Sequence, residues 1–174
     1  MVSGDSSIGG LVGYNQSSAS ISNYYSTGAV SGSSSCGGLI GYKISGSVVG
    51  SFWNTQTSGQ PNRDGGTGKT TAEMKTLSTF TVVPANWDFI GETDNGTNDY
   101  WRMCADGVDY PRLSWEFVKG GDFSCPDGVA MDDVVRLSQD WLATYSQAFY
   151  GADANGDSGV TFADFAILAA NWLE

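Results

Sequence analysis

A pattern of apolar and polar residues occurs twice in the first part of the chain. Val2–Tyr14 recurs as Val30–Tyr42, and Ile21–Tyr25 recurs as Val49–Trp53, with one constant offset and no gap. Short runs of alternating apolar residues between Gly and Ser turns predict β-strands. Because a fixed period of this length is typical of stacked repeats, and a single repeat cannot close a core, we expect a short β-solenoid.

The segment 61–119, which follows the repeats, has a mixed pattern. The pattern predicts one helix and three strands: Thr71–Leu77, Thr79–Val83, Trp101–Cys104 and Leu113–Phe117. The end of a stack of repeats exposes unpaired strand edges and an uncovered core. We therefore expect this segment to be an α+β cap whose large aromatic residues, such as Trp87 and Phe89, are buried.

A loop of twelve residues near the C-terminus concentrates oxygen-bearing side chains. They stand at loop positions 1, 3, 5, 9 and 12: Asp153, Asn155, Asp157, Thr161 and Asp164. Gly159, at position 7, can add its backbone carbonyl. Ca²⁺ takes about six to eight oxygen ligands, which alternate residues of a tight loop can supply. The sequence therefore predicts the principal calcium site here, followed by a helix over Phe162–Leu173.

A second loop of this kind lies earlier in the chain: residues 122–133 align with 153–164 without a gap. The matching residues are Asp122, Ser124, Asp127, Gly128 and Asp133. Pro126 stands at position 5 and has no ligand side chain, so we expect this second site to be weaker or empty. The apolar residues that follow match as well, Val134–Leu142 with Phe165–Leu173, and we expect these two helical stripes to pack against each other.

Both groups of motifs resemble known families. The loop–helix pair resembles a type I dockerin, although position 12 is Asp rather than Glu and position 6 is Ser158 rather than Gly. The core Gly-Gly-Leu-Val/Ile-Gly at Gly9–Gly13 and Gly37–Gly41 resembles GLUG-motif repeats of secreted and surface proteins from bacteria. The resemblances imply a mostly β protein in three parts: a β-solenoid of repeats at 1–60, its α+β cap at 61–119, and a small two-helix EF-hand-like domain at 120–174.

The dockerin resemblance implies Ca²⁺ as the cofactor and a cohesin-like protein as the partner. In that family, the residues at loop positions 10 and 11 contact cohesin. Here these positions hold Met131-Asp132 and Phe162-Ala163 rather than the hydroxyl-rich pair common in the family. Copies of the chain itself, assembled into a filament, sheath or surface layer, are therefore an alternative partner. A polysaccharide stacked on exposed aromatic residues is a further alternative.

Charge is low and unevenly placed. The chain has 19 acids and 8 bases, a net charge of −11, which argues against nucleic acid and anionic membranes as partners. No apolar run is long enough to span a bilayer. Residues 122–174 carry nine acids and one base. These charges repel one another without a counter-ion, which favours metal binding.

Residues suited to catalysis are scarce. The chain has no His, the commonest general base. Two pairs of acids, Asp94 with Asp99 and Asp106 with Asp109, stand in turns. The sequence therefore predicts a non-catalytic, extracellular structural or attachment module that forms the C-terminal part of a larger secreted or surface protein. An appendage of a polysaccharide-degrading enzyme is the alternative.

The three cysteines divide into a single residue and a pair. Cys36 takes the place that Ile8 has in the preceding repeat, where a thiol behaves as a small core hydrophobe, so we expect it to be free. Cys104 and Cys125 are then the pair available for a disulfide in an extracellular chain. Two separate thiols are the alternative.

We predict that non-reducing peptide mapping of the oxidised protein finds one cross-linked pair, Cys104 with Cys125. The bridge would contribute about 3 kcal/mol to stability by restricting the unfolded chain. A peptide that links Cys36 to another cysteine, or three free thiols, would contradict the pairing.

Overall fold

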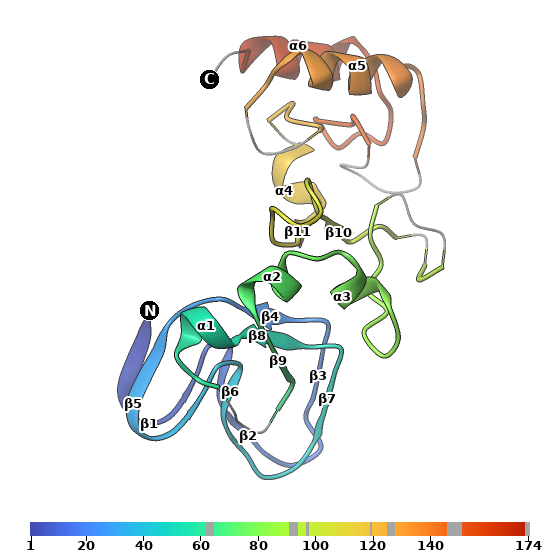
Figure 1. Cartoon of the computed structure of the whole chain (residues 1–174). Helices are drawn as coiled ribbons and strands as arrows, with labels where there is room; N and C mark the ends of the chain where they lie inside the picture. The colour runs from blue at the N-terminus through green and yellow to red at the C-terminus, as the bar shows by residue number, and fades with distance from the viewer. Residues whose placement is uncertain are drawn as a thin grey trace. The chain divides into compact units, whose positions relative to one another are not determined.

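The computed structural model describes residues 1–61, 65–90, 94–96, 98–118, 120–124, 128–145 and 151–172 (Figure 1). They belong to two compact units. The first contains Met1–Asp88, Thr93–Asn95 and Ala105–Tyr110, and the second contains Phe89–Glu92, Gly96–Cys104 and Pro111–Glu174. The segment predicted as the cap, 61–119, therefore contributes residues to both units.

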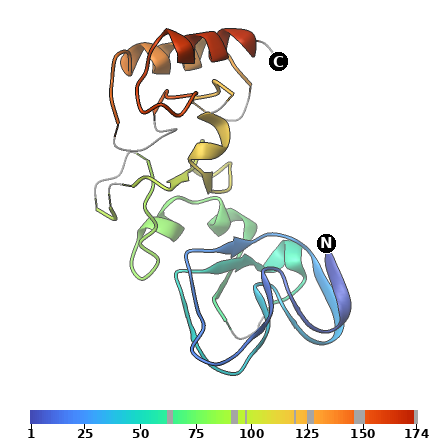
Figure 2. The same cartoon turned by 180° about the vertical axis from the view of Figure 1, so that it is seen from behind.

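Each repeat forms four short strands. Those of the first are β1 (Val2–Gly9), β2 (Val12–Asn15), β3 (Ser20–Ser22) and β4 (Tyr25–Ser26), and those of the second are β5 (Val30–Gly37), β6 (Ile40–Lys43), β7 (Ser47–Val49) and β8 (Phe52–Asn54). Each strand of the first repeat pairs in parallel with its equivalent in the second (Figures 1 and 2). Like residues therefore lie on like residues: the rings of Tyr14 and Tyr42 stack with their centroids 5.5 Å apart.

The register confirms the predicted offset over the first half of the repeat and corrects it over the second. Ile8 pairs with Cys36, as the predicted alignment requires. Ile21, however, pairs with Val48 rather than Val49, one position short of the predicted partner. The prediction of a repeat without a gap is wrong from this point, because the connection 44–46 is one residue shorter than the connection 16–19.

The predicted mostly β fold with a β-solenoid is also wrong. The strands form small sheets of two or three strands, none of them closed or continued as a solenoid over the described residues, of which about 31% are strand and 21% helix. The fold is mixed α/β. The physical reason is that two repeats give each strand of the first repeat a single partner. Within the described ranges, β8 alone gains a further neighbour, β9 (Thr67–Lys69), before the chain turns to helices.

Two short helices flank β9, and each has a side-chain cap. The carboxamide oxygen of Asn54 accepts the N–H groups of Gln56 and Thr57 and starts α1 (Thr55–Ser58). The predicted helix at Thr71 is confirmed as α2 (Thr71–Met74), although it ends before Leu77. Thr70 and Glu73 form its capping box, and hydrogen bonds from Thr70 lower the pKa of Glu73 below its ordinary value.

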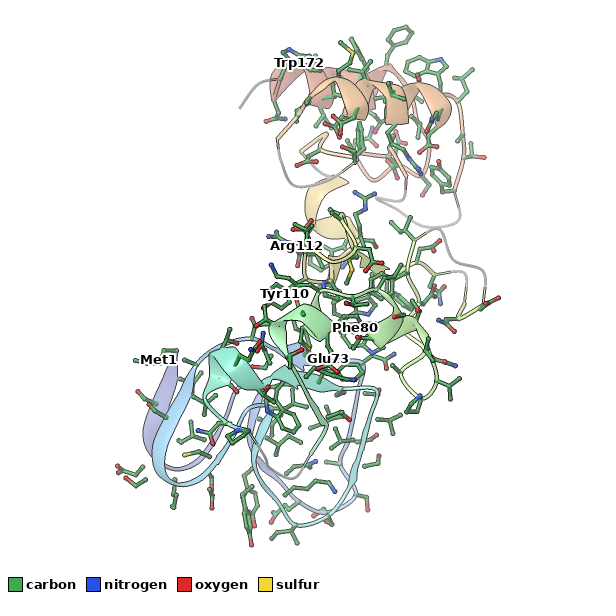
Figure 3. The ribbon with its side chains drawn as sticks, viewed as in Figure 1. Met1, Glu73, Phe80, Tyr110, Arg112 and Trp172 are labelled. Carbon is green, nitrogen blue, oxygen red and sulfur yellow. The ribbon has the colours of Figure 1, made fainter. Side chains whose placement is uncertain are left out.

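The strand predicted over Thr79–Val83 is instead the helix α3 (Ser78–Thr81). Its β-branched residues favour a strand only weakly, and packing overrides them. Phe80 is fully buried, and its ring centroid lies 5.3 Å from that of Phe52 and 4.8 Å from that of Trp87. The helical turn is what places Phe80, labelled in Figure 3, in this aromatic cluster.

A buried amide joins the repeats to the later part of the first unit. Asn54 is 0% exposed, and its Nδ2 donates to the hydroxyls of Thr71 and Tyr110, each at 2.9 Å. Tyr110 (Figure 3) also stacks on Tyr25 of the first repeat, with centroids 6.3 Å apart. Since a buried amide needs partners, Asn54 holds three distant segments of this unit in one place.

The second unit begins with a short antiparallel pair, β10 (Trp101–Arg102) and β11 (Arg112–Leu113). The strand predicted over Trp101–Cys104 is thus confirmed only at its start. The strand predicted over Leu113–Phe117 is wrong beyond its first residue, because the chain turns into α4 (Trp115–Val118). The burial expected for the aromatic residues of the segment 61–119 is confirmed for Trp87 and Phe89, which are 0% and 1% exposed, and is wrong for Trp115, which is 49% exposed.

Two loop–helix halves complete the second unit and lie side by side in Figures 1 and 2, with the helices α5 (Met131–Gln139) and α6 (Phe162–Ala170). Their shared core takes residues from equivalent positions: Phe123 and Ala154, Val129 and Val160, Leu137 and Leu168. The predicted burial of the apolar stripes is correct for the two leucines. It is wrong for Phe165 and Leu142, which are 43% and 72% exposed. No helix in the described part of the chain is long and apolar enough to cross a membrane.

Two glycines with nearly the same φ angle provide a test of this core. Gly121 has φ +83°, and a Cβ there would lie 2.6 Å from the Cα of Leu168; Gly107 has φ +84° and open space around it. We expect Gly107→Ala to cost about 1–2 kcal/mol for the left-handed conformation alone, and Gly121→Ala to cost more, because the α6 backbone must move. Urea unfolding measures both. Equal losses would contradict the close approach of Gly121 to α6.

Candidate metal centre

The loop 153–164 folds around its first side chain. Asp153 is 0% exposed, and its carboxylate accepts the N–H groups of Gly156, Asp157 and Ser158 at 2.8, 3.1 and 3.0 Å. A buried carboxylate is costly unless it is hydrogen-bonded, so these three donors are what allow it to lie at the base of the loop.

The last side chain of the loop starts the helix that follows. Asp164 is also fully buried, and its carboxylate accepts the N–H groups of Asn155 at 3.1 Å and Thr161 at 2.8 Å. The hydroxyl of Thr161 in turn accepts the N–H of Ala163 at 3.2 Å. This capping box explains why α6 begins at this point. It also ties loop position 3 to position 12.

The remaining side chains of the loop form an exposed rim. Asn155 Nδ2 donates to the carboxylate of Asp157 at 2.9 Å, and the N–H of Gly159 donates to the same carboxylate at 2.9 Å. Ser158, at position 6, has φ +72°, in the left-handed region that favours glycine. The loop therefore makes the sharp turn of an EF-hand loop although it lacks the glycine usual at that position.

The loop 122–133 repeats the inner contacts of its partner. Asp133 is 0% exposed, and its carboxylate accepts the N–H groups of Ser124 and Ala130, both at 2.8 Å. These contacts are equivalent to those of Asp164 in the other loop. At position 1, Asp122 accepts the N–H of Gly128 at a longer 3.4 Å.

One predicted ligand of this loop is engaged elsewhere, and another is not described. The hydroxyl of Ser124 lies 2.6 Å from the carboxylate of Asp132 and 2.9 Å from that of Asp133, so it serves the start of α5. Asp127, like Pro126, lies outside the described residues. The described residues of this loop thus reproduce the buried aspartate at position 12 of the other loop, whereas Asp122 at position 1 is only partly buried.

Each loop is fastened to the end of the helix that belongs to the other. Val160 pairs with the chain after α5, because it accepts the N–H of Leu142 at 3.0 Å and donates to the carbonyl of Ala143 at 2.9 Å. Val129 forms a parallel bridge with Trp172, which lies two residues beyond the end of α6 and is labelled in Figure 3. A change in one loop, such as the binding of an ion, therefore acts on both helices.

A polar cluster lies beside the start of the loop 153–164. Arg136 Nε donates to Asp140 at 3.0 Å. Burial raises the pKa of Tyr145 to about 12, and the neighbouring carboxylate of Asp140, to which the Tyr145 hydroxyl is hydrogen-bonded, adds to the effect. A Cβ at Gly151 would lie 2.5 Å from this hydroxyl. The cluster and the glycine together position the chain as it enters the loop.

Arg102, at the end of β10, is a residue of this site that the sequence analysis missed. It is 8% exposed and lines a pocket with Ser124, Asp132 and Arg136. Burial lowers the pKa of Arg102, and Arg136 lowers it further, whereas Asp122 and Asp133 act in the opposite direction. No sequence pattern links Arg102 to these acids. By contrast, Arg136 and Asp140 stand four positions apart on one helix, a spacing that a sequence search can find.

The donors of the loop 153–164 fit Ca²⁺ in kind, because carboxylate, amide and hydroxyl oxygens are the ligands that this ion prefers. Among the described residues, however, no three His, Cys, Asp or Glu side chains converge as a group that could hold a metal. Asn155 and Asp157 bond to each other and to the loop backbone. An ion would have to draw them out of these hydrogen bonds.

The three cysteines are placed as follows. Cys36 is a buried free thiol, which agrees with its predicted place in the core of the second repeat. Cys104 is disulfide-bonded. Its predicted partner, Cys125, lies outside the described residues, and the pairing stays a prediction.

Comparison of the chain with protein-family models, with curated proteins and with solved structures gives no match. The resemblance to dockerins and GLUG-motif repeats therefore rests on the motifs alone.

The buried aspartate at position 12 can be tested without metal. We expect Asp164→Ala to destabilise the protein by about 2 kcal/mol, because the N–H groups of Asn155 and Thr161 lose their acceptor. Gln139, which is exposed on α5, is the control, and Gln139→Ala should cost less than about 0.5 kcal/mol. Urea unfolding in the presence of a chelator, followed by the helical circular dichroism signal, measures both. Equal losses would show that Asp164 does not hold the loop.

Proposed function

We propose that the chain is a non-catalytic, extracellular attachment module that binds Ca²⁺ through its two loop–helix halves. The observation that carries the proposal is the paired set of buried aspartates. Asp153 and Asp164 close one loop and Asp133 closes the other, with equivalent backbone donors in the two loops. Loops built in this way concentrate oxygen atoms within one turn of chain, the arrangement from which EF-hand sites are made.

Charge supports an ion as the ligand. Residues 122–174 carry nine acids and one base, Arg136, and that base is already paired with Asp140. The buried Asp153 and Asp164 accept their hydrogen bonds from backbone N–H groups of the loop. Backbone N–H groups carry only partial charge, so they leave much of the repulsion between the carboxylates in place. A divalent cation would reduce this repulsion more than they do.

The loop 153–164 is the stronger candidate of the two. It offers ligand side chains at five positions, whereas 122–133 has Pro126 at position 5. We therefore propose one principal calcium ion per chain.

The helical face beside the loops supports an attachment role. Met131 and Phe162, at loop position 10 of each half, are 65% and 77% exposed. Phe162 and Phe165 line an apolar groove with Val134 and Trp141. Apolar surface of this kind marks a protein-binding site. A cohesin-like receptor is the partner that we propose for it.

Copies of the chain and a polysaccharide are the alternative partners. Among the aromatic residues that could stack on sugar rings, Trp115 and Tyr100 are 49% and 54% exposed, whereas Trp87 and Phe89 are buried.

Calcium titration by calorimetry tests the proposal. We expect one tight site in the wild-type chain and its loss in the double variant Asp153→Ala with Asp157→Ala, because the carboxylates at loop positions 1 and 5 disappear. Asp5→Ala, which removes an exposed acid far along the chain from both loops, should leave binding unchanged. Binding should also raise the melting temperature of the helical signal, and chelator should reverse the rise.

Retention of the wild-type stoichiometry and affinity by the double variant would overturn the assignment of the loop. Failure of the wild-type chain to bind calcium at all would overturn the function.

A further inference from the structure

The loop 153–164 contains a chemically reactive dipeptide. Asn-Gly occurs twice in the chain, at Asn155-Gly156 and at Asn95-Gly96. Glycine has no side chain to hinder its own backbone nitrogen, so this nitrogen can attack the carboxamide carbon of the asparagine before it. The product is a cyclic imide, which water then opens. The two dipeptides differ in how the structure holds the carboxamide.

The carboxamide of Asn95 is held by carbonyl groups of the fold. Its Nδ2 donates to the carbonyl oxygens of Thr81 and Trp87 at 2.9 and 3.2 Å, and Trp87 is fully buried. To turn toward Gly96, the carboxamide would have to give up both hydrogen bonds, which leaves the two carbonyl oxygens without this donor. We therefore expect Asn95 to react slowly.

The carboxamide of Asn155 is held by its own exposed turn. Asn155 and Asp157 are both exposed. Asn155 Oδ1 accepts the N–H of Asp157 at 2.8 Å, and Nδ2 donates to the Asp157 carboxylate at 2.9 Å. Solvent can replace hydrogen bonds of this kind at little cost. The N–H that Oδ1 accepts also polarises the carboxamide and stabilises the negative charge that develops on this oxygen during attack.

The nitrogen that would attack lies beside a proton acceptor. The N–H of Gly156 donates to Asp153 Oδ1 at 2.8 Å. A carboxylate in this position can take the proton that the nitrogen loses as the new bond forms. Gly156 has φ +78°, a conformation that residues with a side chain rarely adopt. The turn thus favours glycine at this position, and glycine keeps the dipeptide reactive.

We propose that Asn155 is a site of spontaneous deamidation and that calcium in the loop protects it. The bond from the Gly156 nitrogen to Asn155 Cγ forms, and the bond from Cγ to Nδ2 breaks. Nδ2 leaves as ammonia and carries away the proton that the Gly156 nitrogen loses. Water then adds to one of the two imide carbonyls and gives aspartate or isoaspartate.

The protection rests on the proposed function, because it uses the proposed ligands. An ion in the loop would bind the side-chain oxygens of Asp153 and Asn155. The carboxamide would then be fixed away from the Gly156 nitrogen, and the carboxylate beside that nitrogen would be engaged by the ion. Only the ion-free loop is expected to react.

The products alter the site in different ways. Aspartate at position 155 keeps an oxygen ligand at loop position 3. Isoaspartate continues the main chain through its side chain, which adds one carbon to the backbone before Gly156 and shifts the later ligand positions relative to Asp153. Since the loop depends on ligands at alternate residues, we expect isoaspartate to abolish calcium binding. A chain that has lost its ion would therefore gradually lose the site itself.

The test follows both asparagines in the full chain, incubated at constant pH in chelator or in calcium. Peptide mapping measures deamidation, and isoaspartate-specific enzymatic methylation identifies the product. In chelator, Asn155 should convert about tenfold faster than Asn95. At a calcium concentration of about ten times the Kd, conversion of Asn155 should slow about tenfold, because only the ion-free fraction reacts. The rate at Asn95 should not change.

Asn155→Gln is the matched control, because it keeps the carboxamide but requires a larger ring for attack. Conversion at position 155 should fall to background in this variant, and a wild-type rate there would contradict attack by Gly156. Equal rates at Asn155 and Asn95 in chelator would overturn the proposal. So would an Asn155 rate that calcium does not change, in a chain that binds calcium by calorimetry. A chain without calcium binding overturns the proposed function and the protection, whereas the comparison of the two asparagines in chelator needs no ion and decides the reactivity separately.

Discussion

The structure depends on contact between each sequence motif and its own second copy. A single repeat of the N-terminal pattern has too few apolar residues to close a core, and the same is true of a single loop–helix half. Leu39 is buried in a cluster with Ile40 and Trp53, against which Val12 and Ile21 of the first repeat pack. Val160 is buried because the chain after α5 pairs with it. Both units therefore form a core by duplication.

The two duplications differ in how their copies meet. The repeats are related by translation, so each strand of the first repeat pairs in parallel with its equivalent in the second. In the C-terminal pair the contacts are reciprocal: Val129 forms a bridge with Trp172, which follows α6, and Val160 pairs with Leu142 and Ala143, which follow α5.

The buried aspartates give the C-terminal pair its chemistry. Asp133 and Asp164 each hold a loop to the start of a helix through backbone donors. Buried carboxylates are costly in an acidic segment, and the chain satisfies their oxygens with N–H groups. Oxygens of this kind are the ligands that Ca²⁺ prefers, and the proposed calcium site would use the same side chains that support the fold without metal.

Local chemistry explains what the sequence by itself determined. The capping boxes at Thr70 and Thr161 depend on residues three positions apart, and the helices α2 and α6 begin where those residues predict. The pairing of Ile8 with Cys36 follows from identical flanking glycines, and it is also as predicted. The oxygen donors of the loop 153–164 lie on one turn of chain for the same local reason.

Only the tertiary structure decided the features that depend on distant partners. Phe80 makes α3 a helix because Phe52 and Trp87 lie where the helical turn points. A connection one residue shorter moves Ile21 onto Val48. Arg102 approaches the acids of the loop 122–133 from a different strand. The number of stacked repeats limits the sheets to two or three strands, and the fold is mixed α/β. A periodic sequence specifies its own pattern, but strand pairing also requires a neighbouring strand in space.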